Sequence, residues 1–296
     1  MITNKKHDRI VGALLHTFFI LLSAVFIIPI FSVVVIAFTS ETSISANGYP
    51  FFFRELDFTA FKYIFDNPKT ILDAYKVTMI VSFGGTFLYL LISTMAAYVI
   101  SRPDFKYKRH ITFFFFFTML FNGGLVPSYI LISSTLHLKN TYAAMIFPLL
   151  VNVWYLIMLK TFMSDIPNEI IESARIDGAG HGMIYLRFVL PLSKPALATI
   201  GLLTLLDFWN SWQPAMLYID DKEMYPLQYM LQVMLRNIME ILKEMQNNIS
   251  LGGMQNIPSE STRMAMCLLA IGPMLFIFPF FQKYFTSGLT VGAVKG

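Results

Sequence analysis

Six apolar stretches, each long enough to cross a lipid bilayer as a helix, constrain this chain more than any other feature of its sequence. A spanning helix needs about 20 largely apolar residues. Hydrophobic residues make up 56% of the chain and charged residues only 14%, against about 25% charged residues in ordinary globular proteins. The stretches cover residues 10–38, 77–100, 111–133, 142–162, 195–219 and 264–285. We therefore predict an all-α, polytopic membrane protein that forms a single transmembrane domain over residues 1–296.

The basic residues between these stretches predict the orientation of the helices. Cytoplasmic loops of membrane proteins carry an excess of Lys and Arg. The two termini and residues 101–110 and 160–194 together hold more than half of the 22 basic residues. Both termini are therefore expected in the cytoplasm, with residues 163–194 as a cytoplasmic loop and residues 220–263 as an extracellular loop. The first apolar stretch is about twice as long as the apolar core of a signal peptide, so we expect a retained anchor.

The segment between the fourth and fifth stretches predicts two short helices on the inner membrane surface. Asp165 can cap the first helix, Pro167 suits its first turn, and Gly178 can end it in a left-handed conformation. A second helix is expected over residues 183–189, ending before Pro191. The segment is too polar and too short to span a membrane. It is either an ordinary solvated loop or a compact element that docks to a cytoplasmic partner.

The spacing of residues in this segment resembles the EAA loop of ABC-importer permeases. The matching positions are Glu172-Ser173-Ala174, then Gly178 after three residues, then Phe188-Val189-Leu190-Pro191 after nine more. Ser stands for the first Ala of the family pattern and Phe for its Ile, and the spacing is kept in full. Residues 122–127, residues 225–228 and the C-terminal residues 282–296 are similar to carbohydrate-uptake permeases of the MalG type. Within that type they look most like the branch for complex or uronic oligosaccharides.

The resemblance implies a transmembrane permease subunit of an ATP-driven, binding-protein-dependent importer of oligosaccharides in the bacterial plasma (inner) membrane. It also implies a second homologous permease subunit, two cytoplasmic ATPase subunits and an extracellular solute-binding protein. The sequence has no Gly-x-x-x-x-Gly-Lys-Ser/Thr phosphate loop. We therefore expect no enzyme activity and no bound cofactor, with ATP and Mg held by the ATPase partner, and no metal site. The residues implied to couple this chain to the ATPase are Glu172, Ser173, Ala174, Ile176, Asp177, Gly178, Ala179 and Pro191.

Polar residues inside the apolar stretches are candidates for a substrate pathway, because burying them in a membrane is costly. Asp207 lies near the middle of the fifth stretch, and the helical period places Thr204, Asn210, Ser211 and Gln213 on the same face. Residues 122–124 can kink or unwind the third stretch. The full candidate set is Asn122, Gly123, Gly124, Asn152, Asp207, Trp209, Asn210 and Gln213. Packing between neighbouring helices remains the alternative role for this set. Asp207 would repel an anionic uronate unless a cation lay nearby.

Other aromatic and outer-loop residues have separate predicted roles. Trp154 and Tyr155 are expected to pack rather than stack on a ligand. Apolar residues at helical spacing predict an amphipathic helix over residues 227–245, either a lid or a contact for the binding protein. The candidate contacts for the binding protein are Tyr225, Gln228, Gly252, Gly253 and Gln255.

Three other functions compete with a sugar permease. They are an ABC permease for peptide or amino-acid cargo, a stand-alone secondary carrier or channel, and a membrane-embedded enzyme. The enzyme is disfavoured because zinc-protease helix motifs and a Gly-x-Ser-x-Gly elbow are absent, and the five His residues are dispersed. A carrier would not need the spacing around Gly178.

Overall fold

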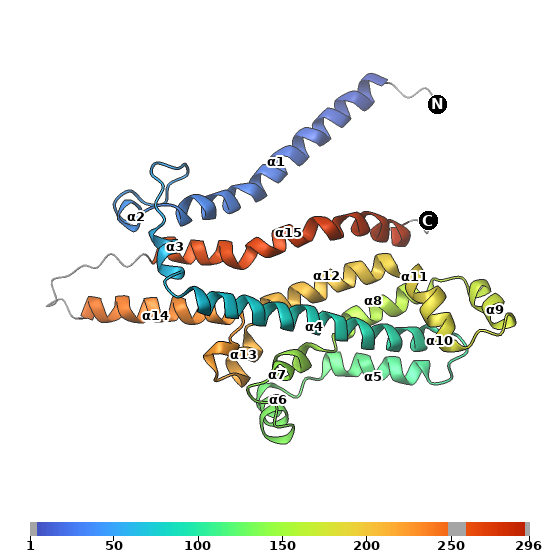
Figure 1. The fold of residues 1–296 in the computed structure, drawn as a ribbon. Coiled ribbons are helices and arrows are strands. Elements are labelled where there is room, and N and C mark those ends of the chain that lie inside the picture. Colours follow the sequence, from blue (N-terminus) through green and yellow to red (C-terminus); the bar gives the residue numbers. More distant parts are fainter. Residues whose placement is uncertain (1–4, 248–258, 294–296) are drawn as a thin grey trace. The chain divides into compact units, whose positions relative to one another are not determined.

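The computed structural model describes residues 5–247 and 259–293, which are largely helical and contain no strand (Figure 1). The predicted all-α class is therefore confirmed. The longer helices are α1 (Lys5–Ala37), α4 (Pro68–Ser101), α5 (Lys108–Leu120), α8 (Val153–Ser164), α12 (Lys194–Asn210), α14 (Leu227–Asn247) and α15 (Glu260–Ala293). The short α-helices are α2 (Glu41–Asn47), α3 (Thr59–Ile64), α6 (Leu125–Ile130), α7 (Tyr142–Ile146), α9 (Asn168–Ile176), α10 (His181–Ile184), α11 (Leu190–Leu192) and α13 (Gln213–Tyr218). Two π-helical segments, η1 (Leu131–Thr135) and η3 (Tyr185–Val189), and two 3₁₀ turns, η2 (Phe147–Leu149) and η4 (Lys222–Met224), complete the order.

The chain divides into two compact units. One contains residues 1–68 and 233–272, and the other contains residues 69–232 and 273–296. In the first unit, apolar side chains on α1 are widely exposed, among them Leu14, Phe26 and Ile27. Such a surface needs an apolar environment, which a bilayer supplies.

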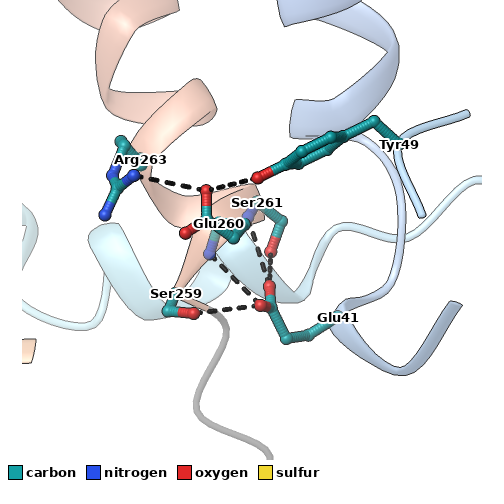
Figure 2. Close-up of polar contacts among 6 residues, drawn as sticks. All are labelled: Glu41, Tyr49, Ser259, Glu260, Ser261 and Arg263. Carbon is teal, nitrogen blue, oxygen red and sulfur yellow. Dashed lines mark hydrogen bonds and ion pairs between the residues drawn. The ribbon is translucent and has the colours of Figure 1, made fainter. Parts of the chain in front are cut away.

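The first unit also holds a polar cluster at the start of α15 (Figure 2). The Glu41 carboxylate accepts hydrogen bonds from the hydroxyls of Ser259 and Ser261, each at 3.0 Å, and from the backbone N–H groups of Glu260 and Ser261, each at 3.2 Å. The Tyr49 hydroxyl donates to Glu260 at 3.2 Å. Because the first N–H groups of a helix lack partners within the helix, the carboxylate of α2 completes the N-terminus of α15.

Three described helices are apolar and long enough to cross a membrane unbroken, within α1, α4 and α15, and three further candidates are bent pairs. The bends are 110° between Lys108–Leu120 and Leu125–Thr135, 58° between Tyr142–Leu149 and Val153–Ser164, and 78° between His181–Leu192 and Lys194–Asn210. A continuous helix over the fourth predicted stretch is therefore wrong, and the fifth is also interrupted, because α12 ends at Asn210 and α13 begins at Gln213. The kink expected near residues 122–124 is confirmed.

The break between α5 and α6 has a local cause in its glycines. Gly124 adopts φ +90°, a conformation that side chains with a Cβ rarely adopt. The Asn122 side-chain oxygen accepts a hydrogen bond from the Gly124 N–H at 2.9 Å. A left-handed glycine and a side chain that bonds its own backbone together replace the helical hydrogen bonds at this point.

Two further interruptions within the predicted stretches, before α8 and before α13, were missed because the apolar composition continues across them. Asn152 is the N-cap of α8, and its side-chain oxygen accepts from the N–H groups of Trp154 and Tyr155 at 3.0 and 3.5 Å. Pro148 precedes it within the 3₁₀ turn. Pro214 lies in the first turn of α13. Its ring would clash with the carbonyl of Asn210 in a continuous helix, and α12 ends at that residue.

In the second unit, α5 and α12 both pack against α8. Figure 1 shows α9 and α10 beside the end of α4 and the start of α5, and α6, α7 and α13 towards the opposite end of these helices. An Arg175–Asp104 ion pair at 2.6 Å joins the loop after α4 to α9. The two loops predicted to be cytoplasmic therefore lie at the same end of the unit, which the predicted topology requires.

Candidate coupling helix and cavity

The first short helix of the predicted loop is α9 (Asn168–Ile176), and its N-cap, Pro167, lies two residues after the expected cap. Asp165 closes α8 instead, because its N–H bonds the carbonyls of Thr161 and Phe162 at 3.2 Å. The capping role predicted for Asp165 is therefore wrong. Pro167 stands at the N-cap position without a side-chain bond, and Glu169 lies in the first turn, where the helix dipole favours an acid.

The turn that ends α9 is the one that the sequence predicted. Gly178 has φ +83°, and its N–H bonds the Arg175 carbonyl at 3.0 Å while the Ala179 N–H bonds the Ala174 carbonyl at 2.9 Å. A left-handed glycine after the last helical residue is a common way to satisfy terminal carbonyls. The loop is thus a compact turn between α9 and α10.

The second helix of the loop was expected to end before Pro191, but the helical backbone continues past this residue. Helical backbone continues from α10 through η3 into α11, which contains Pro191 in its first turn. Proline has no N–H to donate to the preceding turn, and the π-helical segment η3 directly before it accommodates that gap in the helical hydrogen bonds. The bend comes later, between Leu192 and Lys194.

The predicted coupling residues divide into an outward and an inward set. Ile176 is 86% exposed, an unusual environment for a large apolar side chain. Ala174 is 4% exposed and packs within this chain, so its small size serves packing beneath α9 rather than an outer contact. Ala179 is half-buried, and the other exposed members are Glu172, Ser173, Asp177, Gly178 and Pro191.

Two charged groups hold the loop after α4 against this element. The Arg175 side chain donates to the Asp104 carboxylate, and this bond lowers the pKa of Asp104 below its usual value. Arg102 is 4% exposed and donates to the Met163 carbonyl at 2.6 Å. Burial lowers the pKa of Arg102, and the carbonyl dipole partly offsets the cost of the buried charge.

A cavity of about 1150 Å³ lies among α5, α6, α8, α12 and α13. It brings together most of the polar residues that the sequence singled out. Those lining it are Asn122, Gly124, Asn152, Asp207, Asn210 and Gln213, together with Thr204 and Ser211. Gly123 is not among its lining residues, and neither is Trp209, whose side chain is 1% exposed.

The single helical face predicted for the fifth stretch is wrong, although its polar members still meet at the cavity. Ser211 and Gln213 lie beyond the end of α12, on either side of the break before α13. The break turns the chain, and both residues still line the cavity with Asp207. Helical periodicity alone does not describe a wall built from two helices and the turn between them.

The three asparagines of the cavity all bond the protein itself. Asn122 and Asn152 accept from backbone N–H groups at the two helix breaks. Asn210 donates to the Leu206 carbonyl at 2.9 Å and accepts from the Gln228 side chain at 3.2 Å. These amides therefore shape the cavity wall, and Asp207 and Gln213 add two further exposed polar groups to it.

Aromatic residues line the cavity more extensively than the sequence suggested. Trp154 lines it and is 61% exposed, so the expectation that it only packs is wrong. Tyr155 also lines it, as does Asp207. Their position directly after the helix-capping Asn152 was the signal that could have placed them at a wall.

The outer-loop candidates are only partly described. The predicted amphipathic helix is confirmed as α14. Tyr225 stacks edge-on against Tyr229 with ring centroids 4.6 Å apart, and Gln228 bonds Asn210 of the cavity wall. Gly252, Gly253 and Gln255 lie outside the described residues.

Comparison with known proteins assigns the family. Residues 90–291 match the family described as the binding-protein-dependent transport system inner membrane component. The chain belongs to this family. It is therefore a permease, a membrane subunit of an ABC transporter rather than a catalytic one.

Individual relatives of this permease match along nearly its full length. The polygalacturonan/rhamnogalacturonan transport system permease protein YtcP of Bacillus subtilis is 33% identical, over 98% of this chain and 99% of that protein. An arabinooligosaccharides transport system permease protein of Halalkalibacterium halodurans is 27% identical over 99% of both chains. A solved structure of a bacterial ABC transporter involved in the import of the acidic polysaccharide alginate matches with a TM-score of 0.78 and 26% identity, covering 94% of this chain and 98% of that chain.

Proposed function

We propose that this permease is the membrane subunit of an ATP-driven, binding-protein-dependent importer of oligosaccharides. The observation that carries the proposal is the match to the transport family over residues 90–291, joined to relatives whose names specify saccharide transport. The peptide-permease and stand-alone carrier alternatives are not favoured by these relatives. The complex contains a second homologous permease subunit, two cytoplasmic ATPase subunits that bind ATP and Mg, and an extracellular solute-binding protein. This chain itself binds no cofactor.

The proposed topology has six spans and both termini in the cytoplasm of a bacterial cell. Three unbroken helices and three bent pairs supply six candidates of sufficient apolar length. The basic loops gather at the end of the unit where α9 lies, and such loops favour the cytoplasmic side. Both compact units belong to one permease domain in this proposal, because the family match extends over parts of each.

The proposed contact with the ATPase is the exposed side of α9 and its terminal turn. Ile176 offers an exposed apolar side chain that a partner would cover. Glu172, Ser173 and Asp177 add exposed polar groups around it. Ala174, Gly178 and Ala179 shape the turn, and Pro191 continues the following helix. An Ile176→Asp variant is expected to abolish association with the ATPase, whereas Met183→Asp, at another exposed apolar position in α10, should retain it.

The proposed substrate pathway runs through the cavity of the second unit. Trp154 offers an exposed aromatic face suited to a sugar ring, and Gln213 and Asp207 offer groups that bond hydroxyls. Asn122, Gly124, Asn152 and Asn210 hold the wall in shape, while Gly123 and Trp209 support it from outside the lining. Tyr225 and Gln228, with Gly252, Gly253 and Gln255, form the proposed contact for the binding protein.

The experiment that tests this function is ATPase activity of the reconstituted complex of both permeases, the ATPase and the binding protein. A panel of neutral and uronic oligosaccharides is added, with peptides as the contrasting cargo. Stimulation by one class of saccharide is the expected result. A complex that assembles but responds to peptides alone, or to nothing, would refute oligosaccharide import.

A further inference from the structure

Helix α4 contacts the segment that follows the coupling helix through two matched polar rungs. The Thr94 and Tyr185 hydroxyls lie 2.7 Å apart, and the Tyr98 hydroxyl lies 3.3 Å from His181 Nδ1. Thr94 and Tyr98 are four positions apart on α4, and His181 and Tyr185 are four positions apart on the other segment. The two polar contacts therefore lie on one face of each helix. The Tyr98 and Tyr185 rings also pack, with centroids 5.4 Å apart.

The residues just beyond α4 extend this attachment to both neighbouring helices. Arg102 donates to the carbonyl of Met163 near the end of α8 at 2.6 Å, and to the Ser101 hydroxyl at 3.0 and 3.1 Å. The nearby Asp104 pairs with Arg175 of α9 at 2.6 Å. A single corner of the chain thus holds the last turn of α8 and the coupling helix together.

Further along α4, a second tyrosine contacts the wall of the cavity. Tyr89 is 0% exposed, and its hydroxyl donates to the backbone carbonyl of Asn152 at 3.0 Å. Its ring meets that of Tyr155 edge-on, with ring centroids 6.4 Å apart, and Tyr155 lines the cavity together with Asp207. The contact falls at the break before α8, where the chain bends by 58°.

The helix between the two contacts is short and uninterrupted. Nine residues separate Tyr89 from Tyr98, about 13 Å at a rise of about 1.5 Å per residue. No proline lies between these two tyrosines, so this stretch of α4 lacks the usual cause of a sharp kink. This stretch of α4 is therefore expected to move as a rigid rod, so that a displacement at Tyr98 also displaces Tyr89.

We infer that α4 transmits movement of the coupling helix to the cavity, with Tyr98 and Tyr89 as the positioning residues at its two ends. The inference rests on the proposed function. Tyr98 takes up the movement through the segment that starts at His181. Tyr89 delivers it to the break at Asn152, where the helix is already interrupted and the Asn152 side chain caps α8. The aromatic wall of the cavity then shifts with the ATPase cycle.

Single and double Tyr→Phe substitutions in the full importer complex test this inference. Tyr98→Phe and Tyr89→Phe each remove one hydroxyl and keep the ring. Tyr107→Phe is the control, because this exposed residue lies just after α4 and outside both contacts. Thr94→Val removes the other rung and serves in place of Tyr98→Phe if that variant does not assemble. The readouts are basal ATPase activity, ATPase activity stimulated by oligosaccharide and loaded binding protein, and saccharide transported per ATP.

Each single variant is expected to lower stimulated activity about five-fold, the equivalent of one hydrogen bond of about 1 kcal/mol. Basal activity should not change. The stimulated activity of the double variant should be no lower than that of the more impaired single variant, because both residues act in one path. Two outcomes would overturn this inference but leave the proposed function intact. In one, the losses of stimulated activity multiply in the double variant; in the other, the variants behave like Tyr107→Phe in a complex that oligosaccharide stimulates. A wild-type complex that no oligosaccharide stimulates would refute the proposed function and this inference with it.

Discussion

Replacing Gly178 with alanine isolates the contribution of one backbone conformation to the turn between α9 and α10, the proposed coupling element. The residue has φ +83°, and a Cβ built there meets no atom within 4 Å. Steric overlap with neighbours therefore adds nothing, and the cost is the left-handed conformation itself, about 1–2 kcal/mol for a residue with a side chain. That energy shifts the equilibrium between the ordered and opened turn about 5- to 30-fold.

Hydrogen exchange of the α9–α10 turn, read by mass spectrometry on the assembled importer, measures this shift directly. Gly178→Ala should speed exchange of the terminal amides by that factor and lower stimulated ATPase activity. Gly178→Asn should do less, because asparagine tolerates the left-handed region better. Gly180→Ala is the matched control, since that glycine has φ −74° and equally open space. Equal protection in both alanine variants would refute the argument that the turn depends on left-handed backbone.

Three further outcomes follow from contacts elsewhere in the chain. A Cβ at Gly85 would lie 2.6 Å from the Phe208 ring, so Gly85→Ala should lower thermal stability by about 1–3 kcal/mol, whereas Gly84→Ala, with open space, should not. Glu41→Ala should cost about 2 kcal/mol in thermal unfolding, because several donors at the start of α15 lose a charged acceptor; a wild-type melting temperature would contradict the capping role in Figure 2. The pKa of Asp104 is lowered in the folded chain, so its stabilisation is complete above its unfolded pKa of about 4 and is lost as pH falls through the folded value. Asp104→Asn should therefore lower the melting temperature at pH 7, by an amount that shrinks as the pH falls below about 4; a difference independent of pH would contradict the ion pair.

The helical class, the apolar segments and the turn at Gly178 could all be predicted from local sequence. Apolar stretches of spanning length indicate helices that face lipid rather than water. The turn around Gly178 could be predicted because the end of a helix often needs one residue in the left-handed conformation, and glycine adopts it readily. The kink at residues 122–124 was equally local, since Gly124 and the Asn122 side chain act on adjacent backbone.

The two missed breaks also had local signals, but hydropathy concealed them. Asn152 and Pro214 each interrupt a helix that remains apolar on both sides. An average over about 20 residues gives one polar cap or one proline little weight. The cap of α9 was misassigned because Asp165 can serve the end of one helix as readily as the start of the next.

The sequence by itself determined which residues were polar inside an apolar chain, and the tertiary structure decided what those residues do. Ala174 and Ile176 both belong to the same motif, yet one is buried and the other exposed, because packing under α9 selects a side of the helix. The amides of Asn122, Asn152 and Asn210 bond backbone groups at the cavity wall, and Trp154 lines the cavity beside them. The pairing of Tyr98 with His181 and of Tyr89 with Asn152 joins residues more than 60 positions apart. No local pattern encodes such contacts, because they depend on how whole helices pack.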